Sequence, residues 1–294
     1  MLSSFVEATG TKGCDNFSLP LSAGLFACLS FYYGSFGFYL YILFTVGILL
    51  LSLKLRLLTA DGVVAAIMTA TTLYLLGSPW LALSLHGFYL LGSSVSKVKN
   101  ERKRNANRLQ ESTGARTWVQ VVCNSLPASI LVWFSYFFPK YPIFALLAFA
   151  VFSAAAADTF SSELGTLSKA QVFDIITGKK VHRGLSGGVS FPGLIAGLVG
   201  SLLLSLFALP QFGLTGMIFV AAIGFLGTLI DSVLGALFQR KYLSASGELS
   251  DKAFETGQKP TQGFYWISNN TVNFLSLLLV SLIGHLANLL YRVV

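Results

Sequence analysis

The sequence predicts an all-α fold, a polytopic helix bundle embedded in a membrane, and three observations support this. Hydrophobic residues make up 54% of the 294-residue chain and charged residues only 11%, whereas soluble domains carry about 25% charged residues. Apolar runs long enough to cross a bilayer as helices recur along the chain. Only a few carboxylates interrupt these runs, which makes those acids the first candidates for a working site.

About nine apolar stretches are candidate transmembrane helices, and the doubtful ones leave a range of seven to nine. They cover residues 19–34, 36–53, 61–77, 80–96, 118–138, 142–160, 189–208, 213–239 and 267–291. Only Gly34 and Gly37 break the tract 17–53, so it forms either a tight hairpin or one bent helix. Residues 1–18 are an N-terminal polar segment without the pattern of a secretory signal. We expect residues 19–294 to form a single integral membrane domain.

Basic residues indicate how the bundle is oriented. They concentrate in three loops, near residues 97–117, 161–188 and 240–266, whereas the opposite connections carry only Lys140 and Arg292. The positive-inside rule therefore predicts that these loops and the N-terminus are cytoplasmic. The simplest account of the net charge of +8 is this topological signal together with attraction to anionic lipid headgroups. The basic residues lack interleaved aromatics, so we expect no nucleic-acid partner.

Three acids lie in or beside apolar runs. Asp158 and Glu163 follow the apolar stretch from Tyr141 to Ala157, and Asp231 lies inside the run 213–238. A carboxylate near the bilayer centre costs roughly 2.5 to 3.5 kcal/mol on insertion scales, so such acids usually face a bundle interior, a cation or a water-filled cavity. Asp231 shares a helical stripe with small and polar residues at spacings of three and four, which is either a packing seam or part of a site: Gly224, Gly227, Thr228, Ser232, Gly235 and Gln239.

Two further segments carry polar patterns. The loop from Ile175 to Ser190 is cationic and rich in glycine, and such loops turn backbone N–H groups toward bound anions. No Walker A pattern is present, so both phosphate binding and a plain connector remain open. Asn269, Asn270 and Asn273 share one face of the last helix. They are either interhelical hydrogen-bond partners or ligand contacts.

Other polar residues have simpler expected roles. His86 and His285 stand alone in apolar runs and are expected to pack between helices. Asp61, with Thr59, is expected to cap the helix that begins there. The three cysteines are far apart and show no metal-binding spacing, so they are expected to be packing residues.

Taken together, these motifs resemble the integral membrane family that includes the plant phytyl-phosphate kinase of vitamin E synthesis and many bacterial, archaeal and animal members. The matching blocks occur in the family's order after residue 58: 93–97, 114–124, 157–169, 175–190, 224–239 and 269–274. Phe160 stands where the family commonly has Trp. His182, Arg183 and Ser186 occupy a loop that commonly contains Pro and Asn.

The resemblance implies a kinase that transfers phosphate from a nucleoside triphosphate, CTP or another, to a prenyl monophosphate. Asp158, Glu163 and Asp231 would then be catalytic, with Asp158 and Asp231 binding Mg²⁺. Phosphoryl transfer mainly requires positioning and charge neutralisation. The candidates for nucleotide or phosphate binding are Lys97, Arg116, Ser162, Lys169, Lys179, Lys180, Arg183, Gly187, Gly188, Asn270 and Asn273. We expect the isoprenoid tail in a lipid-facing groove between helices.

Two other classes of protein remain as alternatives. A CTP-dependent lipid-phosphate nucleotidyltransferase would use the same acids, metal and basic loop but would release pyrophosphate. A lipid or ion transporter would also retain intramembrane acids, but transporters often contain inverted repeats. The sequence shows no convincing internal repeat, and its polar motifs gather at one membrane face. This favours an enzyme that acts on an interfacial headgroup.

Overall fold

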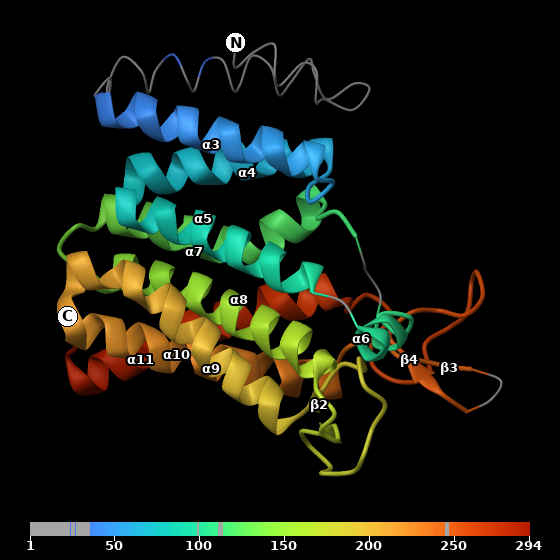
Figure 1. The fold of residues 1–294 in the computed structure, drawn as a ribbon. Helices are drawn as coiled ribbons and strands as arrows, with labels where there is room; N and C mark the ends of the chain where they lie inside the picture. Colours follow the sequence, from blue (N-terminus) through green and yellow to red (C-terminus); the bar gives the residue numbers. More distant parts are fainter. Residues whose placement is uncertain (1–23, 25–26, 28–35, 99, 111–113, 245–246) are drawn as a thin grey trace.

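The computed structural model describes residues 24, 27, 36–98, 100–110, 114–244 and 247–294, and most of this part of the chain is helical. Figure 1 shows the long helices lying side by side, from α3 at the top to α9, α10 and α11 at the bottom. The helices are α3 (Phe36–Lys54), α4 (Ala60–Thr72) with its π-helical continuation η1 (Leu73–Gly77), α5 (Pro79–Lys97), α6 (Glu101–Ala106), α7 (Trp118–Phe137), α8 (Ile143–Leu167), α9 (Phe191–Ser205), the 3₁₀ turn η2 (Leu206–Ala208), α10 (Leu209–Leu237) and α11 (Asn269–Tyr291).

Two short antiparallel ribbons lie in the loops at one end of the bundle (Figure 1). Strand β1 (Phe173–Asp174) pairs with β2 (Gly188–Val189), with Phe173 opposite Val189. Strand β3 (Tyr242–Leu243) pairs with β4 (Leu249–Ser250), with Tyr242 opposite Ser250. Each ribbon closes a loop that joins two long helices.

Six helical segments of the described chain are long and apolar enough to cross a membrane, which confirms a polytopic helical membrane protein but does not support nine spans. They are 36–54, 60–77, 118–137, 143–167, 191–237 and 269–291. The expected helix 19–34 lies outside the described residues. The expected helix 80–96 exists as α5 but is not one of the six, because four serines and His86 reduce its apolarity. The side of the membrane on which the N-terminus lies stays a prediction.

The segment 191–237 folds back on itself, so the two expected helices 189–208 and 213–239 both exist within it. Gly213 leaves the helical conformation, with φ of 65° and ψ of −170°, a region that glycine enters readily. Ser201 of α9 donates a hydrogen bond to the carbonyl of Ala221 in α10 (2.5 Å). A Cβ on Gly197 would lie 3.4 Å from Cγ2 of Thr228. Because the earlier residue of α9 meets the later residue of α10, the two helices are antiparallel.

Helix α8 lies at the centre of the bundle, and most of its side chains from Ala145 to Ala157 are buried. Small residues let its neighbours approach closely. A Cβ on Gly200 of α9 would lie 2.9 Å from the carbonyl oxygen of Ala156, and one on Gly227 of α10 would lie 2.5 Å from Cβ of Ala154. Part of the predicted glycine stripe on α10 is therefore a packing seam against α8, and this seam fixes where Asp231 lies.

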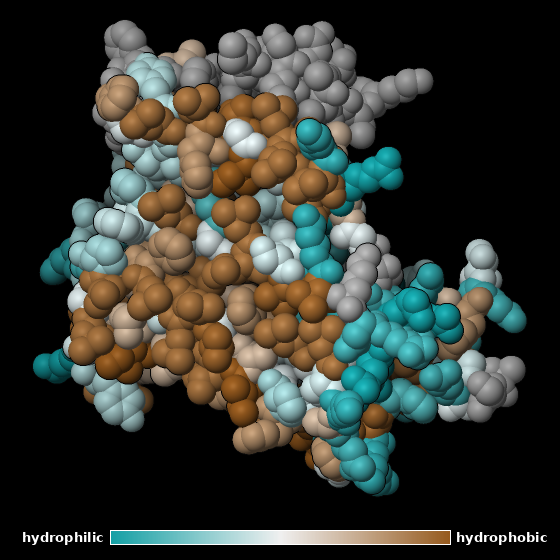
Figure 2. Space-filling view, viewed as in Figure 1, coloured by the Kyte–Doolittle hydropathy of each residue, from teal (hydrophilic) through white to brown (hydrophobic). Residues whose placement is uncertain are grey.

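The hydrophilic residues gather at one end of the molecule, over α6 and the loops that carry the ribbons, while apolar residues cover the helices (Figure 2). We call this end the polar end. Its three loops are tied together: Ser186 Oγ donates to Oδ2 of Asp251 (2.6 Å), and the backbone N–H of Asp251 donates to the carbonyl of Leu109 (2.9 Å). The three basic loops predicted from the sequence thus form one layer.

Helices α4, α9 and α11 begin at the polar end with side-chain caps. The hydroxyl of Thr59 accepts the N–H of Gly62, Ser190 accepts from Gly193, and Ser268 accepts from Thr271. Such caps satisfy backbone donors that have no partner within the helix. The expected cap at Thr59 is confirmed.

Candidate functional site

The site is built around two acids that face each other across α8 and α10. The carboxyl groups of Asp158 and Asp231 lie within hydrogen-bonding range of one another. From α11, the single hydroxyl proton of Ser276 is shared between Oδ1 of Asp231 (3.2 Å) and the carbonyl of Asn273 (2.9 Å). The amide of Asn273, turned so that its nitrogen faces the acid, donates to the same oxygen (3.2 Å) and to the carbonyl of Asn269 (3.1 Å).

A small cavity of about 10 Å³ opens between these side chains, and we call it the acid cavity. Asp158, Asp231, Asn273 and Ser276 line it, and Asn124 adds a further amide from α7. Four helices therefore contribute polar groups to one point. The Mg²⁺ site that the family resemblance implied had placed Asp158 and Asp231 together, with Asn273 among the candidate ligands, while Asn124 and Ser276 were not among the predicted site residues.

The two carboxyl groups of the acid cavity require a cation or a proton to balance their negative charge. Among the described residues, neither Asp158 nor Asp231 takes part in an ion pair. Two carboxylates this close do not both remain ionised unless a cation or a proton lies between them. The donors are oxygens, the type that Mg²⁺ prefers, and Mg²⁺ commonly binds one or two carboxylates and completes its shell with phosphate and water. The described chain contains no cluster of three or more His, Cys, Asp or Glu that would form an all-protein cage.

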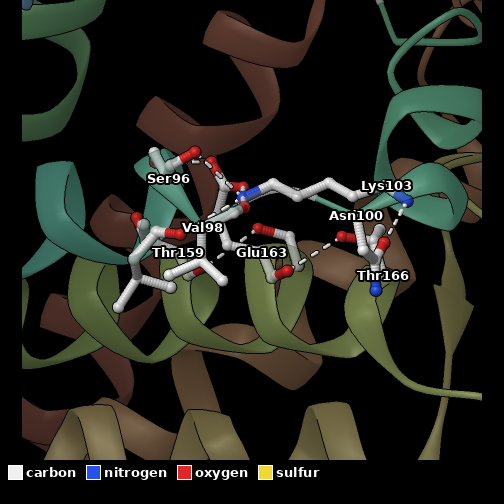
Figure 3. Close-up of polar contacts among 9 residues, drawn as sticks. Ser96, Val98, Asn100, Lys103, Thr159, Glu163 and Thr166 are labelled. Atoms are coloured by element: carbon white, nitrogen blue, oxygen red, sulfur yellow. Dashed lines mark hydrogen bonds and ion pairs between the residues drawn. The ribbon is translucent and has the colours of Figure 1, made fainter.

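Glu163 lies in a different environment, shown in Figure 3. Its Oε2 lies 2.6 Å from the ammonium of Lys103, and its Oε1 accepts a hydrogen bond from Ser96 Oγ (2.5 Å). The Lys103 side chain is only 3% exposed. Glu163 is therefore already neutralised and ties α8 to α5, whereas its predicted catalytic role stays a prediction.

Lys103 also caps α5. Its ammonium donates to the carbonyls of Val95 (3.2 Å), Ser96 (3.0 Å) and Val98 (2.8 Å), at the C-terminal end of that helix. Carbonyls there have no partner within the helix, and the helix dipole favours a cation. The sequence does not single out Lys103, because it is one of seven basic residues in one loop.

Arg183 and Lys241 cap two more helices in the same way. The Arg183 guanidinium donates to the carbonyls of Thr166 (3.3 Å), Ser168 and Ala170 (2.7 Å), at the end of α8. The Lys241 ammonium donates to the carbonyl of Ala236, at the end of α10 (3.1 Å). Burial lowers the pKa of Lys241, and nearby carboxylates oppose that shift. The structure thus uses Arg183 to hold a helix end and does not bring it to the acid cavity.

Arg116 is a predicted phosphate ligand whose side chain reaches in between α5 and α8. Its guanidinium lies over the rings of Phe88 (5.3 Å) and Tyr89 (5.8 Å), a favourable cation–π arrangement. A Cβ on Gly92 would lie 2.9 Å from Nη2 of Arg116 and 3.4 Å from Cγ2 of Thr159. The guanidinium therefore lies between α5 and the face of α8 that carries Thr159 and Glu163.

The remaining predicted phosphate ligands do not line the acid cavity. The exposed ones lie at the polar end: Lys97, Ser162, Lys169, Lys179 and Lys180. Asn270 is in the first turn of α11, where it is partly buried. Their contact with phosphate stays a prediction.

Gly187 and Gly188 are required by packing. Gly187 has φ of 85°, and a Cβ there would lie 2.5 Å from Cβ of Ala236. A Cβ on Gly188 would lie 2.8 Å from Cγ1 of Val172. Gly187 lets the loop dock against α10 and Gly188 lets the loop pack on itself, and their part in phosphate binding stays a prediction.

His86 and His285 behave as helix-packing residues. His86 is buried, with Nδ1 bonded to the carbonyl of Ala82 (2.8 Å) and Nε2 to Thr45 Oγ1 (3.1 Å). The ring of His285 stacks on Phe144 at 6.0 Å between centroids. The simpler interpretation of both residues is therefore supported.

Comparison with known proteins identifies the family. The family model described as integral membrane protein DUF92 matches residues 43–281. Protein PGR of Arabidopsis thaliana is 33% identical over 266 residues, which cover 81% of this chain and 91% of PGR. An uncharacterised membrane protein of Methanocaldococcus jannaschii is 35% identical over 190 residues, covering 64% and 77% of the two chains.

A more distant relative is Protein VTE6, chloroplastic, of Arabidopsis thaliana, which is 24% identical over 235 residues, covering 77% of this chain and 64% of VTE6. No solved structure matches the chain. The resemblance drawn from the sequence motifs is confirmed, and the chain belongs to the DUF92 family of integral membrane proteins.

Proposed function

We propose that this protein transfers a phosphoryl group from a nucleoside triphosphate to a prenyl monophosphate, giving the prenyl diphosphate. The observation that carries the proposal is the acid pair Asp158 and Asp231, which lacks an ion-pair partner among the described residues. Membership of a family that resembles the plant phytyl-phosphate kinase supports the same reaction, as does the distant relationship to VTE6.

The reaction requires one bond to form and one to break. An oxygen of the prenyl monophosphate attacks the γ-phosphorus, the bond from that phosphorus to the β-bridging oxygen breaks, and a nucleoside diphosphate leaves. The acceptor is already an ionised phosphate, so no strong general base is needed. What the protein must supply is alignment and positive charge around several phosphate groups.

The residues around the acid cavity divide this work. Asp158 and Asp231 would bind Mg²⁺, which when bound neutralises charge on the phosphate oxygens. Ser276 and Asn273 hold the Asp231 carboxylate in position through their hydrogen bonds. Arg116 would hold the acceptor phosphate. The exposed lysines of the polar end would bind the phosphates of the nucleotide as the nucleotide enters the site.

The sidedness of the site follows from the positive-inside rule. The basic loops, including Lys97, Lys179 and Lys180, lie at the same end of the bundle as the acid cavity. If that end is cytoplasmic, the site faces the nucleoside triphosphate pool. A lipid acceptor would reach it from the bilayer with its phosphate at the interface.

The decisive experiment is product analysis. The purified protein in nanodiscs is incubated with Mg²⁺, each of the four nucleoside triphosphates and geranylgeranyl or phytyl monophosphate, and products are resolved by mass. We expect the prenyl diphosphate and a nucleoside diphosphate, and neither with Asp231→Asn. A nucleotide-linked lipid with pyrophosphate would indicate a nucleotidyltransferase. Movement of prenyl phosphate across sealed vesicles without either product would indicate a transporter.

A further inference from the structure

A second, larger cavity lies inside the bundle between α3, α4, α5 and α7. Its volume is about 60 Å³, against about 10 Å³ for the acid cavity. Asn124 of α7 lines both cavities, so they adjoin. We call the larger one the apolar cavity because most of its walls are aliphatic or aromatic: Ile48, Leu49, Ala66, Leu85, Phe88 and Val121.

The apolar cavity is elongated along the helices. Its lining runs along α7 from Arg116, just before the helix, to Ser125, and along α4 from Leu58 to Ala70. At 1.5 Å per residue these stretches correspond to roughly 14 to 18 Å. A volume of about 60 Å³ provides only about four to six water-sized positions over that length. The space therefore suits a narrow chain better than a ring system.

The two ends of the apolar cavity differ in charge. The end nearest the basic loops has the guanidinium of Arg116, which lies near Thr159 of α8. The deep end has His86 and Thr45, which bond to each other (3.1 Å). The other ring nitrogen of His86 is bonded to a carbonyl (2.8 Å), so an apolar chain would leave no ring nitrogen unsatisfied there.

We propose that the apolar cavity binds the part of the isoprenoid chain nearest the phosphate, with the phosphate held by Arg116, which lines the same cavity. This rests on the proposed function and makes it more specific. It puts the chain inside the bundle, among α3, α4, α5 and α7, and not in a groove on the lipid-facing surface. The small volume limits the enclosed part to the first isoprene units, and the rest of the chain continues into the bilayer.

A binding experiment without nucleotide tests this placement directly. The probe is geranylgeranyl monophosphate with a photoreactive diazirine on the isoprene unit next to the phosphate, cross-linked to the full chain in nanodiscs. We expect labelled peptides from α4, α5 or α7. Labelling confined to α9, α10 or α11 would overturn the proposal.

Filling the apolar cavity provides the matched comparison. Ala66→Phe introduces a ring into the cavity, whereas Ala65→Phe adds the same ring at the preceding residue of α4, which does not line it. We expect Ala66→Phe to reduce labelling by about tenfold, the size of a typical overpacking penalty, and Ala65→Phe to preserve it. Equal labelling of the two variants would overturn the proposal. If Ala66→Phe fails to fold, Leu85→Phe with Leu83→Phe as its control answers the same question.

Competition separates a prenyl phosphate site from a general anionic lipid site. We expect unlabelled geranylgeranyl monophosphate to displace the probe and dioleoyl phosphatidic acid not to. Equal displacement by both would overturn the isoprenoid assignment. The cross-linking needs no turnover, so a protein that binds the probe as expected but forms no diphosphate would contradict the proposed function alone.

Discussion

Two carboxylate sites on α8 lie five residues apart and have opposite surroundings. Glu163 is paired with the buried ammonium of Lys103 at 2.6 Å and with Ser96. Asp158 meets a second carboxylate, that of Asp231, and no cation from the described chain. The protein itself compensates the charge of Glu163, whereas it does not compensate the charge of the acid pair.

The difference distinguishes a structural acid from an acid available for chemistry. A buried pair such as Glu163 and Lys103 has its charge compensated, so losing one partner damages the fold. An acid pair has excess negative charge that a bound cation would relieve. The comparison can be tested by changing each site and measuring turnover and stability separately.

The largest effect is expected at the acid pair. Asp158→Asn and Asp231→Asn keep the shape of the side chain but remove the charge proposed to hold Mg²⁺. We expect each to lower kcat by at least about 10²- to 10³-fold, the usual cost of removing a key electrostatic group. The melting temperature should stay the same or rise, because repulsion between the carboxylates is removed.

Glu163→Gln is the control for these two variants. It keeps the contact with Ser96 but leaves the buried Lys103 without its counter-ion. We therefore expect the free energy of unfolding to fall, and kcat to fall much less than in the two Asp variants. Near-normal turnover in both Asp variants, or a loss of turnover in Glu163→Gln as large as theirs, would remove the distinction between the two sites.

The second effect is on stability, at the balanced site. Lys103→Met leaves Glu163 without a cation and the end of α5 uncapped, and breaking a buried ion pair typically costs about 3 to 5 kcal/mol in the free energy of unfolding. The double variant Lys103→Met with Glu163→Gln should recover part of the loss. Reversible unfolding of the single and double variants measures the coupling.

Arg104→Met is the matched control, since Arg104 is 72% exposed and faces Glu101 at only 3.9 Å. Exposed pairs contribute little, so its effect should be under about 1 kcal/mol. A double variant no more stable than the sum of its parts would show that the ion pair is not the source of the loss.

The sequence predicted much of the fold because the length of apolar runs determines where membrane helices lie. The expected helix 118–138 agrees with α7, Trp118–Phe137. Helix α8 continues to Leu167, seven residues beyond its predicted end. It can do so because its polar last turns find partners from distant loops, such as Lys103 for Glu163. Sequence alone does not reveal a partner 60 residues away.

The candidate site was partly predictable from the spacing of its residues along two helices. The spacing of residues on α10 and α11 indicated faces with Asp231 and Asn273, and the two helices pack so that these faces meet at Asp158. The basic residues were less predictable. Their number indicated a charged loop, but only the fold separates Lys103 and Arg183, which cap helices, from the exposed Lys180.

The third and smaller effect should distinguish two basic residues of one loop, the exposed Lys180 and the helix-capping Arg183. Lys180→Ala removes an exposed charge, and if Lys180 contacts phosphate it should lower kcat/KM by about tenfold or more at unchanged melting temperature. Arg183→Ala should instead lower the melting temperature, because three backbone carbonyls lose their donor. Steady-state kinetics and thermal unfolding of both variants are the measurements. If Lys180→Ala leaves kinetics unchanged, the loop is a connector.

The smallest expected effect compares two serines, each of which donates a hydrogen bond to a carboxylate. Ser276 donates to Asp231 (3.2 Å), and Ser96 donates to Glu163 (2.5 Å). Ser276→Ala should raise the Mg²⁺ concentration for half-maximal activity by about three- to tenfold, because one hydrogen bond that orients the ligand is worth about 1 kcal/mol. Asn273 also donates to Asp231, which keeps the change small.

Ser96→Ala should leave the Mg²⁺ dependence unchanged and lower the melting temperature by a few degrees, roughly the shift that 1 kcal/mol produces. Mg²⁺ titrations and melting curves of the two alanine variants give four measurements. If Ser96→Ala shifts the Mg²⁺ dependence as much as Ser276→Ala does, then Glu163 belongs to the metal site and its pairing with Lys103 must open during turnover. If neither serine variant changes the Mg²⁺ concentration for half-maximal activity while both lower the melting temperature, the acid pair has a structural role, as Glu163 does.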